Sequence, residues 1–111
     1  MSNIPFITQI IKVEPFKITS MWNTGEVRVN DFEDEFNESG KHEAFYQLAD
    51  YDIFKYVSIG DVGTLQWVNL PITITFAQEK MTLPFDLDPI VLYEKSQPIS
   101  KYRLVHTNEL V

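Results

Sequence analysis

Carboxylates are the side chains of this sequence whose type and spacing could do chemistry, and they are concentrated in one stretch. The chain has 111 residues, with sixteen Asp and Glu against nine Lys and Arg, for a net charge of −7. Residues 31–52 carry eight of the acids and one lysine, so this segment alone has a charge of −7. Its densest part is a group of five carboxylates: Asp31, Glu33, Asp34, Glu35 and Glu38. Such a group could bind a cation or attract a basic partner protein.

The spacing of these acids does not fit a calcium-binding loop of the EF-hand type. That loop needs a glycine at its sixth position and a glutamate at its twelfth. Counted from Asp31, these positions hold Phe36 and His42. A run of charges is most simply a solvated connector, and among functional roles the docking of a basic partner is favoured because it needs no exact geometry. The sequence therefore predicts no metal site and no cofactor.

Acid–base or metal-dependent hydrolysis is the alternative function that carboxylates allow. The residues it could use are Asp31, Glu35, His42, Asp86 and Asp88. The two histidines, His42 and His106, are far apart in the sequence and neither has a partner at the spacing of metal ligands. Asp88 precedes Pro89, a pattern that the capping of a helix explains by itself. A hydrolase of this kind would require at least three of the five side chains to converge in one pocket.

Two tryptophans are the candidates for apolar contact with a partner. Trp22 and Trp67 each lie in a segment of alternating polarity, so either side chain could face the core or the solvent. Aromatic residues dominate the cores of small domains, which favours burial. An exposed tryptophan would instead be a natural anchor at a protein interface, because tryptophan is enriched at binding hot spots. The predicted partner-binding set is thus the five acids together with Trp22 and Trp67.

The composition excludes several other classes of function. A sequence pI near 4.6 argues against direct binding of nucleic acid and against an anionic membrane surface, because both need clustered cations. The chain contains no cysteine and no apolar run long enough to cross a bilayer. Its first residues also lack the basic and apolar regions of a signal peptide. These features predict a soluble cytoplasmic protein.

The elements that must position these side chains are short strands and two helices. Residues 16–22 and 26–30 alternate around Asn23-Thr24-Gly25, which predicts a β-hairpin preceded by a strand over 6–13. Two further hairpins are expected over 56–68 and 72–83. The helices are expected over 42–50, which has a helical apolar stripe, and from Asp88-Pro89 onward. We therefore predict an α+β domain over residues 1–96, with a small, mostly antiparallel sheet of hairpins, one covering helix and a C-terminal helix, followed by a tail over 97–111.

Several of these segments resemble the bacterial family known as domain of unknown function 2442. The matching segments are Thr24–Arg28, the stretch with Leu48, Phe54 and Val57, Gly63–Asn69, and Leu87–Glu94. The resemblance spans roughly residues 8–96, which is most of the chain. The sequence departs from the family at Trp67-Val68-Asn69-Leu70, where the usual turn is Trp-Pro-Asn-Gly, and in the residues 71–86 that precede the last helix.

The resemblance implies an α+β fold on a small antiparallel sheet, with no established catalytic residue, cofactor or substrate. Some members of the family are fused to a helix-turn-helix DNA-binding domain, and no such segment is visible in this chain. Many members look like partners of another small protein. We therefore expect a non-enzymatic interaction module, antitoxin-like or a regulatory subunit, that docks a basic partner.

Overall fold

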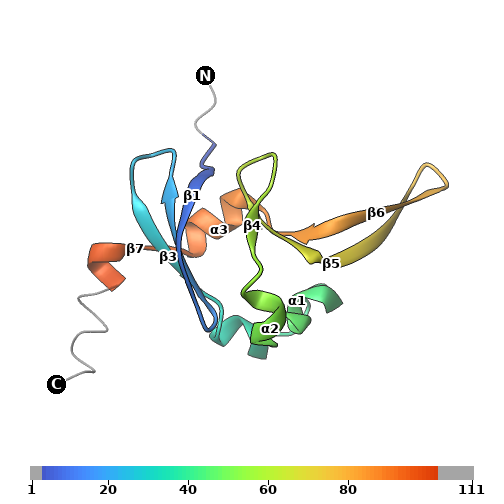
Figure 1. The fold of residues 1–111 in the computed structure, drawn as a ribbon, viewed down its shortest axis with the longest axis horizontal. Coiled ribbons are helices and arrows are strands. Elements are labelled where there is room, and N and C mark those ends of the chain that lie inside the picture. Colours follow the sequence, from blue (N-terminus) through green and yellow to red (C-terminus); the bar gives the residue numbers. More distant parts are fainter. Residues whose placement is uncertain (1–3, 103–111) are drawn as a thin grey trace.

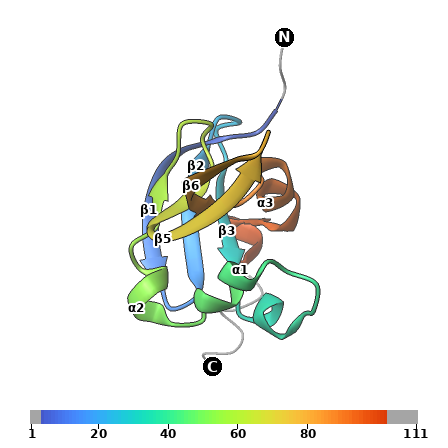
Figure 2. The same cartoon turned by 90° about the vertical axis from the view of Figure 1, so that its right-hand side faces the viewer.

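The computed structural model describes residues 4–102 as an α+β fold with two small antiparallel sheets, which confirms the predicted fold class (Figure 1). The strands are β1 (Ile7–Glu14), β2 (Lys17–Trp22), β3 (Val27–Asp31), β4 (Ser58–Ile59), β5 (Leu65–Phe76), β6 (Glu79–Asp86) and β7 (Gln97–Pro98). The helical segments are the 3₁₀ turn η1 (Asp34–Asn37) and the helices α1 (Glu43–Gln47), α2 (Tyr51–Phe54) and α3 (Pro89–Lys95). The core lies between the two sheets, and the short helices close its lower side (Figure 2).

The first sheet has the strand order β1-β2-β3-β7 and contains the predicted hairpin. β2 and β3 pair around the Asn23-Thr24-Gly25 turn, where Gly25 adopts a φ of +86° that glycine accepts without steric cost. β1 and β2 are joined by a tighter turn at Pro15-Phe16. Phe16 has a φ of +65°, which is uncommon for a bulky residue. Its ring packs edge-on against Phe36 and Phe54, and these contacts offset the backbone strain.

The second sheet has the order β4-β5-β6, and one long strand replaces two of the predicted ones. The predicted strands over 64–68 and 72–76 are both part of β5, which pairs with β4 at its start and with β6 along its length. The register shifts between Trp67 and Pro71, so the proline sits at an irregularity of the ladder. β5 and β6 therefore form a long hairpin that projects beyond the core (Figure 1).

The predicted helix over residues 42–50 is divided into α1 and α2. Asp50 has an extended backbone conformation, and its carboxylate accepts a hydrogen bond from the Asp52 N–H, so it begins a new helix. His42 begins α1 in the same way, because its Nδ1 accepts from the Ala44 N–H at 2.9 Å. Phe45 and Leu48, two residues of the predicted apolar stripe, are buried as expected.

The C-terminal segment joins the first sheet. Asp88 caps α3 as predicted, since its carboxylate accepts a hydrogen bond from the Ile90 N–H at 2.8 Å. After α3 the chain returns as β7, which pairs with β3, and residues 99–102 are helical. Residues 97–102 of the predicted tail are thus ordered against the domain, and residues 103–111 lie outside the described part of the chain.

Both tryptophans lie in the core, which corrects the prediction that they anchor a partner. The exposed fractions of Trp22 and Trp67 are 1% and 0%. The Trp67 ring packs against Phe54 and Phe85, and its indole N–H donates to the Phe54 carbonyl oxygen at 2.9 Å. Trp22 packs edge-on against Tyr93 of α3. An indole ring offers more apolar area to a small core than other side chains, so burial is favoured over exposure at both positions.

Candidate partner-binding surface

The five predicted acids follow the end of β3 and surround the η1 turn. Asp31 is the last residue of β3, and the chain then turns so that Phe32 enters the core. Burial of Phe32 leaves Glu33 and Asp34 on the outer side, where both are exposed. Glu35 is half-buried, and Glu38 follows the turn with an exposed side chain. The local fold therefore brings the five residues to one region of the surface, as the sequence suggests.

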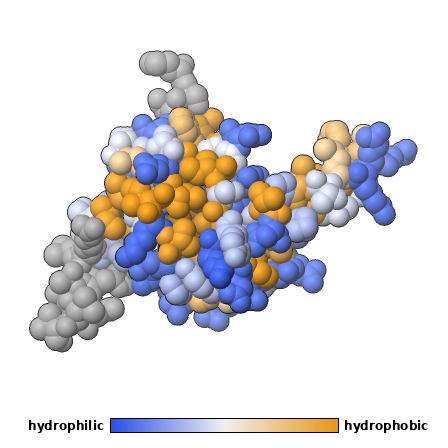
Figure 3. Space-filling view, in the orientation of Figure 1, coloured by the Kyte–Doolittle hydropathy of each residue, from blue (hydrophilic) through white to orange (hydrophobic). Residues whose placement is uncertain are grey.

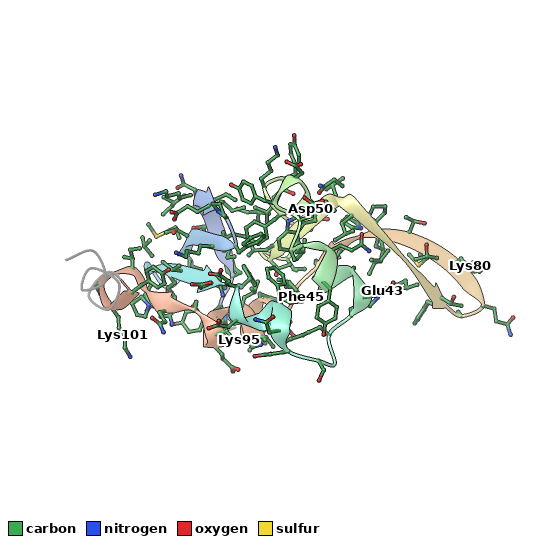
Figure 4. The ribbon with its side chains drawn as sticks, turned by 90° about the horizontal axis from the view of Figure 1, so that it is seen from below. Glu43, Phe45, Asp50, Lys80, Lys95 and Lys101 are labelled. Carbon is green, nitrogen blue, oxygen red and sulfur yellow. The ribbon has the colours of Figure 1, made fainter. Side chains whose placement is uncertain are left out.

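Ion pairs with one distant and one nearby lysine partly compensate two of these carboxylates. Glu35 lies 3.3 Å from the Lys95 ammonium at the end of α3, and Figure 4 shows Lys95 beside this turn. Glu38 lies 3.4 Å from the ammonium of Lys41. Both glutamates therefore contribute less to the field outside the protein than their number suggests.

Asp31 also has cationic and polar neighbours within the fold. It is paired with Lys17 across the β2–β3 ladder, and its Oδ2 lies 3.4 Å from the Tyr102 hydroxyl. The Tyr102 hydroxyl, and to a lesser degree the negative charge of Asp31, raise the pKa of Lys17. The charge of Asp31 is thus partly compensated by a lysine of its own sheet.

Among the described residues, Glu33 and Asp34 have no lysine beside them of the kind that Glu35 and Glu38 have in their ion pairs and Asp31 has across the β2–β3 ladder. In the described part of the chain, neither side chain forms an ion pair with a lysine or arginine. Both side chains are exposed, and the two residues are adjacent in the sequence. These two carboxylates are therefore the members of the predicted set that retain an uncompensated charge for an external cation.

A groove lies next to these acids, between α3 and the η1–α1 segment. Its volume is about 130 Å³. Apolar side chains make up half of its lining: Phe32, Phe45, Leu87, Val91 and Leu92. Polar and charged residues supply the other half: Asn30, Glu35, Lys41, Asp88 and Lys95. A groove of this volume has room for about one side chain.

Hydrogen bonds from β3 hold α3 at one side of the groove. The Asn30 amide donates to the Leu92 carbonyl oxygen at 2.8 Å. Two residues earlier, the Arg28 guanidinium donates to the Ser96 hydroxyl and to the Ser96 carbonyl oxygen. Sequence patterns did not indicate Lys41, Val91 or Lys95 as site residues, because their role depends on the contact of α3 with a segment fifty residues earlier in the chain.

The residues named for hydrolysis do not converge. Glu35 and Asp88 share the groove, whereas Asp31, His42 and Asp86 do not line it. His42 uses its Nδ1 as a helix cap, and Asp88 uses a carboxylate oxygen in the same way. Within residues 4–102, no three His, Asp or Glu side chains form a group that could hold a metal ion. The arrangement that a hydrolase of this kind requires is therefore missing from the described residues.

Comparisons with known proteins add no family to this geometry. No protein-family model matches the chain, and neither a curated protein nor a solved structure matches it. The resemblance to domain of unknown function 2442 stays a prediction. Among the described residues, no helix combines the length and the apolar character needed to cross a bilayer.

Proposed function

We propose that this protein is a non-enzymatic interaction module that docks a basic partner protein at the η1 turn. The observation that carries the proposal is the position of Glu33 and Asp34, two exposed carboxylates without an internal cation. They lie in the chain between Phe32 and Glu35, which line a groove whose lining is half apolar. The carboxylates would attract and orient a basic surface, and the groove would accept an apolar side chain next to it. In a bacterial cytoplasm, such a module would act as a regulatory or antitoxin-like subunit.

The two parts of the surface have different energetic roles. Exposed carboxylates mainly raise the rate of encounter and select the sign of the partner's charge. Burial of an apolar side chain in the groove would supply affinity, since it removes apolar surface from water on both sides. Val91, which lines the groove, is 44% exposed, so the apolar part of the groove is accessible from the solvent.

The hydrolase alternative has less support. Only two of its five residues share the groove, and both have partners within the fold: Glu35 pairs with Lys95, and Asp88 accepts from the Ile90 N–H. Each of these carboxylates thus has a structural role within the fold, and no third member of the set joins them in the groove.

Capture of the partner at two salt concentrations tests the proposal. Purified tagged protein is exposed to a lysate of its source cells, bound proteins are identified by mass spectrometry, and the main partner is produced in pure form. A basic partner whose binding weakens at high salt is the expected result, because the Debye length falls from about 8 Å near physiological salt to about 3 Å at 1 M. A purified partner that is acidic, or whose binding does not depend on salt, would contradict it.

A matched pair of charge reversals locates the surface. Asp34→Lys should weaken binding of the purified partner by about tenfold, because it replaces an attraction by a repulsion. Asp61→Lys makes the same change in net charge in the exposed loop between β4 and β5, at the top of Figure 1 and away from η1. Equal effects of the two variants would show that only net charge matters and would overturn the assignment of the surface.

A further inference from the structure

The hairpin of β5 and β6 forms an arm over residues 71–84. Its strands pair in regular register, with Ile72 opposite Leu83 and Ile74 opposite Met81. The two turn residues both have positive φ, 51° at Ala77 and 67° at Gln78, as in the two-residue turns that match the twist of a hairpin. Figure 4 places Lys80 at the far end of this arm, away from the rest of the molecule.

One face of the arm is apolar and exposed. Side chains that are two residues apart share a face, and so do directly opposed residues of an antiparallel pair. The apolar stripe consists of Ile72, Ile74, Phe76, Met81 and Leu83. Phe76 is 72% exposed. Ile74, Met81 and Leu83 are each 39–44% exposed. Glu79 is opposite Phe76 and therefore lies on the same face at the tip of the arm, whereas the opposite face carries Thr73, Thr75, Lys80 and Thr82.

The apolar stripe continues a face of the sheet that is buried in the core. Phe85 follows Met81 and Leu83 at the same two-residue spacing on β6. Its ring packs against Trp67 and lies 5.9 Å from that of His42 at the start of α1, and it is 5% exposed. The arm therefore presents a core-type surface beyond the point where the protein's own core ends. Figure 3 shows hydrophobic residues along the arm up to its hydrophilic tip.

An uncovered arm of this kind is costly for the protein. A two-stranded hairpin without a covering layer is at best marginally stable in water. β6 is the edge strand of its sheet, and β4 reaches only the first two residues of β5, so the outer half of the arm has two open edges. A second layer on the apolar stripe would exclude water from this surface and stabilise the arm.

We propose that the apolar stripe is covered by the same stripe of a second copy of this chain, in a two-fold symmetric dimer. The charge distribution favours this occupant. Residues 71–84 contain one acid and one base, Glu79 and Lys80, so the arm is neutral in a protein of net charge −7. Two acidic molecules can therefore meet at the arm with less repulsion than at residues 31–52, because Lys80 balances the charge of its neighbour Glu79 at the tip.

Self-complementarity supports the same conclusion. A two-fold interface uses one surface twice, so it requires a patch that packs against itself. Aliphatic side chains that alternate along two paired strands meet this requirement, because two such faces interdigitate as in the core of a β-sandwich. The acidic η1 turn is not part of the apolar stripe, so a dimer formed through the stripe leaves it free for the basic partner of the proposed function.

Sedimentation equilibrium over a wide range of concentrations tests the dimer, with two matched variants. Ile74→Glu places a charge in the apolar stripe, and Thr75→Glu places the same charge on the opposite face of the same strand. We expect the native chain and Thr75→Glu to dimerise, and Ile74→Glu to raise the dimer dissociation constant by about a hundredfold. Circular dichroism of each variant checks that the core, which neither residue enters, remains folded.

Two results would overturn the dimer. One is a native chain that stays monomeric at every concentration, including a monomer that instead binds vesicles or another protein through the arm. The other is dimerisation that Ile74→Glu and Thr75→Glu affect equally. High salt separates this proposal from the proposed function, because an apolar dimer persists at a salt concentration that releases a partner held by Glu33 and Asp34.

Discussion

Arg28 of β3 donates two hydrogen bonds to Ser96 at the end of α3, sixty-eight residues later in the sequence. Its Nε donates to the Ser96 hydroxyl at 2.5 Å, and its Nη2 donates to the Ser96 carbonyl oxygen at 3.0 Å. The same guanidinium donates to the Glu26 carboxylate at 2.6 Å and lies over the Tyr93 ring. Its side chain is 11% exposed. This group of contacts attaches α3, and with it one wall of the groove, to the first sheet.

Removal of the guanidinium should destabilise the protein. Arg28→Ala leaves the oxygens of Ser96, a buried residue, without their donor. Glu26 loses one donor and keeps those of Thr24 and Tyr93. We expect the free energy of unfolding to fall by about 3 kcal/mol. Urea denaturation followed by circular dichroism measures the change. Lys12→Ala is the control, because Lys12 and Glu14 form an exposed pair at 3.6 Å that should contribute less than about 1 kcal/mol. Equal losses in the two variants would contradict this role of Arg28.

The stability of the protein should depend on the ionisation of Glu26. A hydrogen bond from the Tyr93 hydroxyl, followed by contacts with Thr24 and Arg28, lowers the pKa of Glu26 from its ordinary value of 4.5. Because the pKa is lower in the folded state, this contribution is present above pH 4.5 and is lost as the pH falls through the folded-state pKa. The free energy of unfolding should therefore decrease below pH 4.5, and it should decrease less in Glu26→Gln. If the free energy of unfolding of Glu26→Gln fell with acid as much as that of the native chain, ionisation of Glu26 would not contribute to stability.

Gly63 should tolerate no side chain. It has a φ of +72°, and a Cβ built on it would lie 2.6 Å from the Cβ of Phe6. Gly63→Ala combines backbone strain with this clash, and we expect it to destabilise the protein by about 2–4 kcal/mol. Gly25→Ala is the matched control, since Gly25 has a φ of +86° with nothing within 4 Å of its Cβ position, and strain alone costs about 1 kcal/mol. Thermal unfolding of both variants measures the difference, and similar losses would show that the contact with Phe6 adds nothing.

Local signals in the sequence are sufficient for part of the fold. The turn at Gly25 and the cap at Asp88 were predicted because each depends on a few adjacent residues, and both are confirmed. The continuity of β5 through Pro71 was not predicted, because a proline ends a regular strand unless a register shift accommodates it.

The candidate site was only partly accessible to sequence reasoning, because much of it depends on contacts between distant segments. The acidic stretch is a local feature, and the structure does bring its residues together. The pairing of Glu35 with Lys95, and of Arg28 with Ser96, needs the position of α3, which no local pattern specifies. The alternation of residues along β2 and β5 did not indicate whether Trp22 and Trp67 face the core or the solvent. Their burial depends on how the sheets and helices pack, which local patterns do not specify.

The most direct test of the docking surface is the salt dependence of the dissociation constant for the purified partner, measured by isothermal titration calorimetry for the native chain, Asp34→Lys and Asp61→Lys. If Glu33 and Asp34 attract the partner, affinity should fall steeply with salt for the native chain and for Asp61→Lys. Asp34→Lys should bind more weakly at low salt and with a shallower salt dependence. The same affinity and the same salt dependence in all three proteins would contradict this attraction.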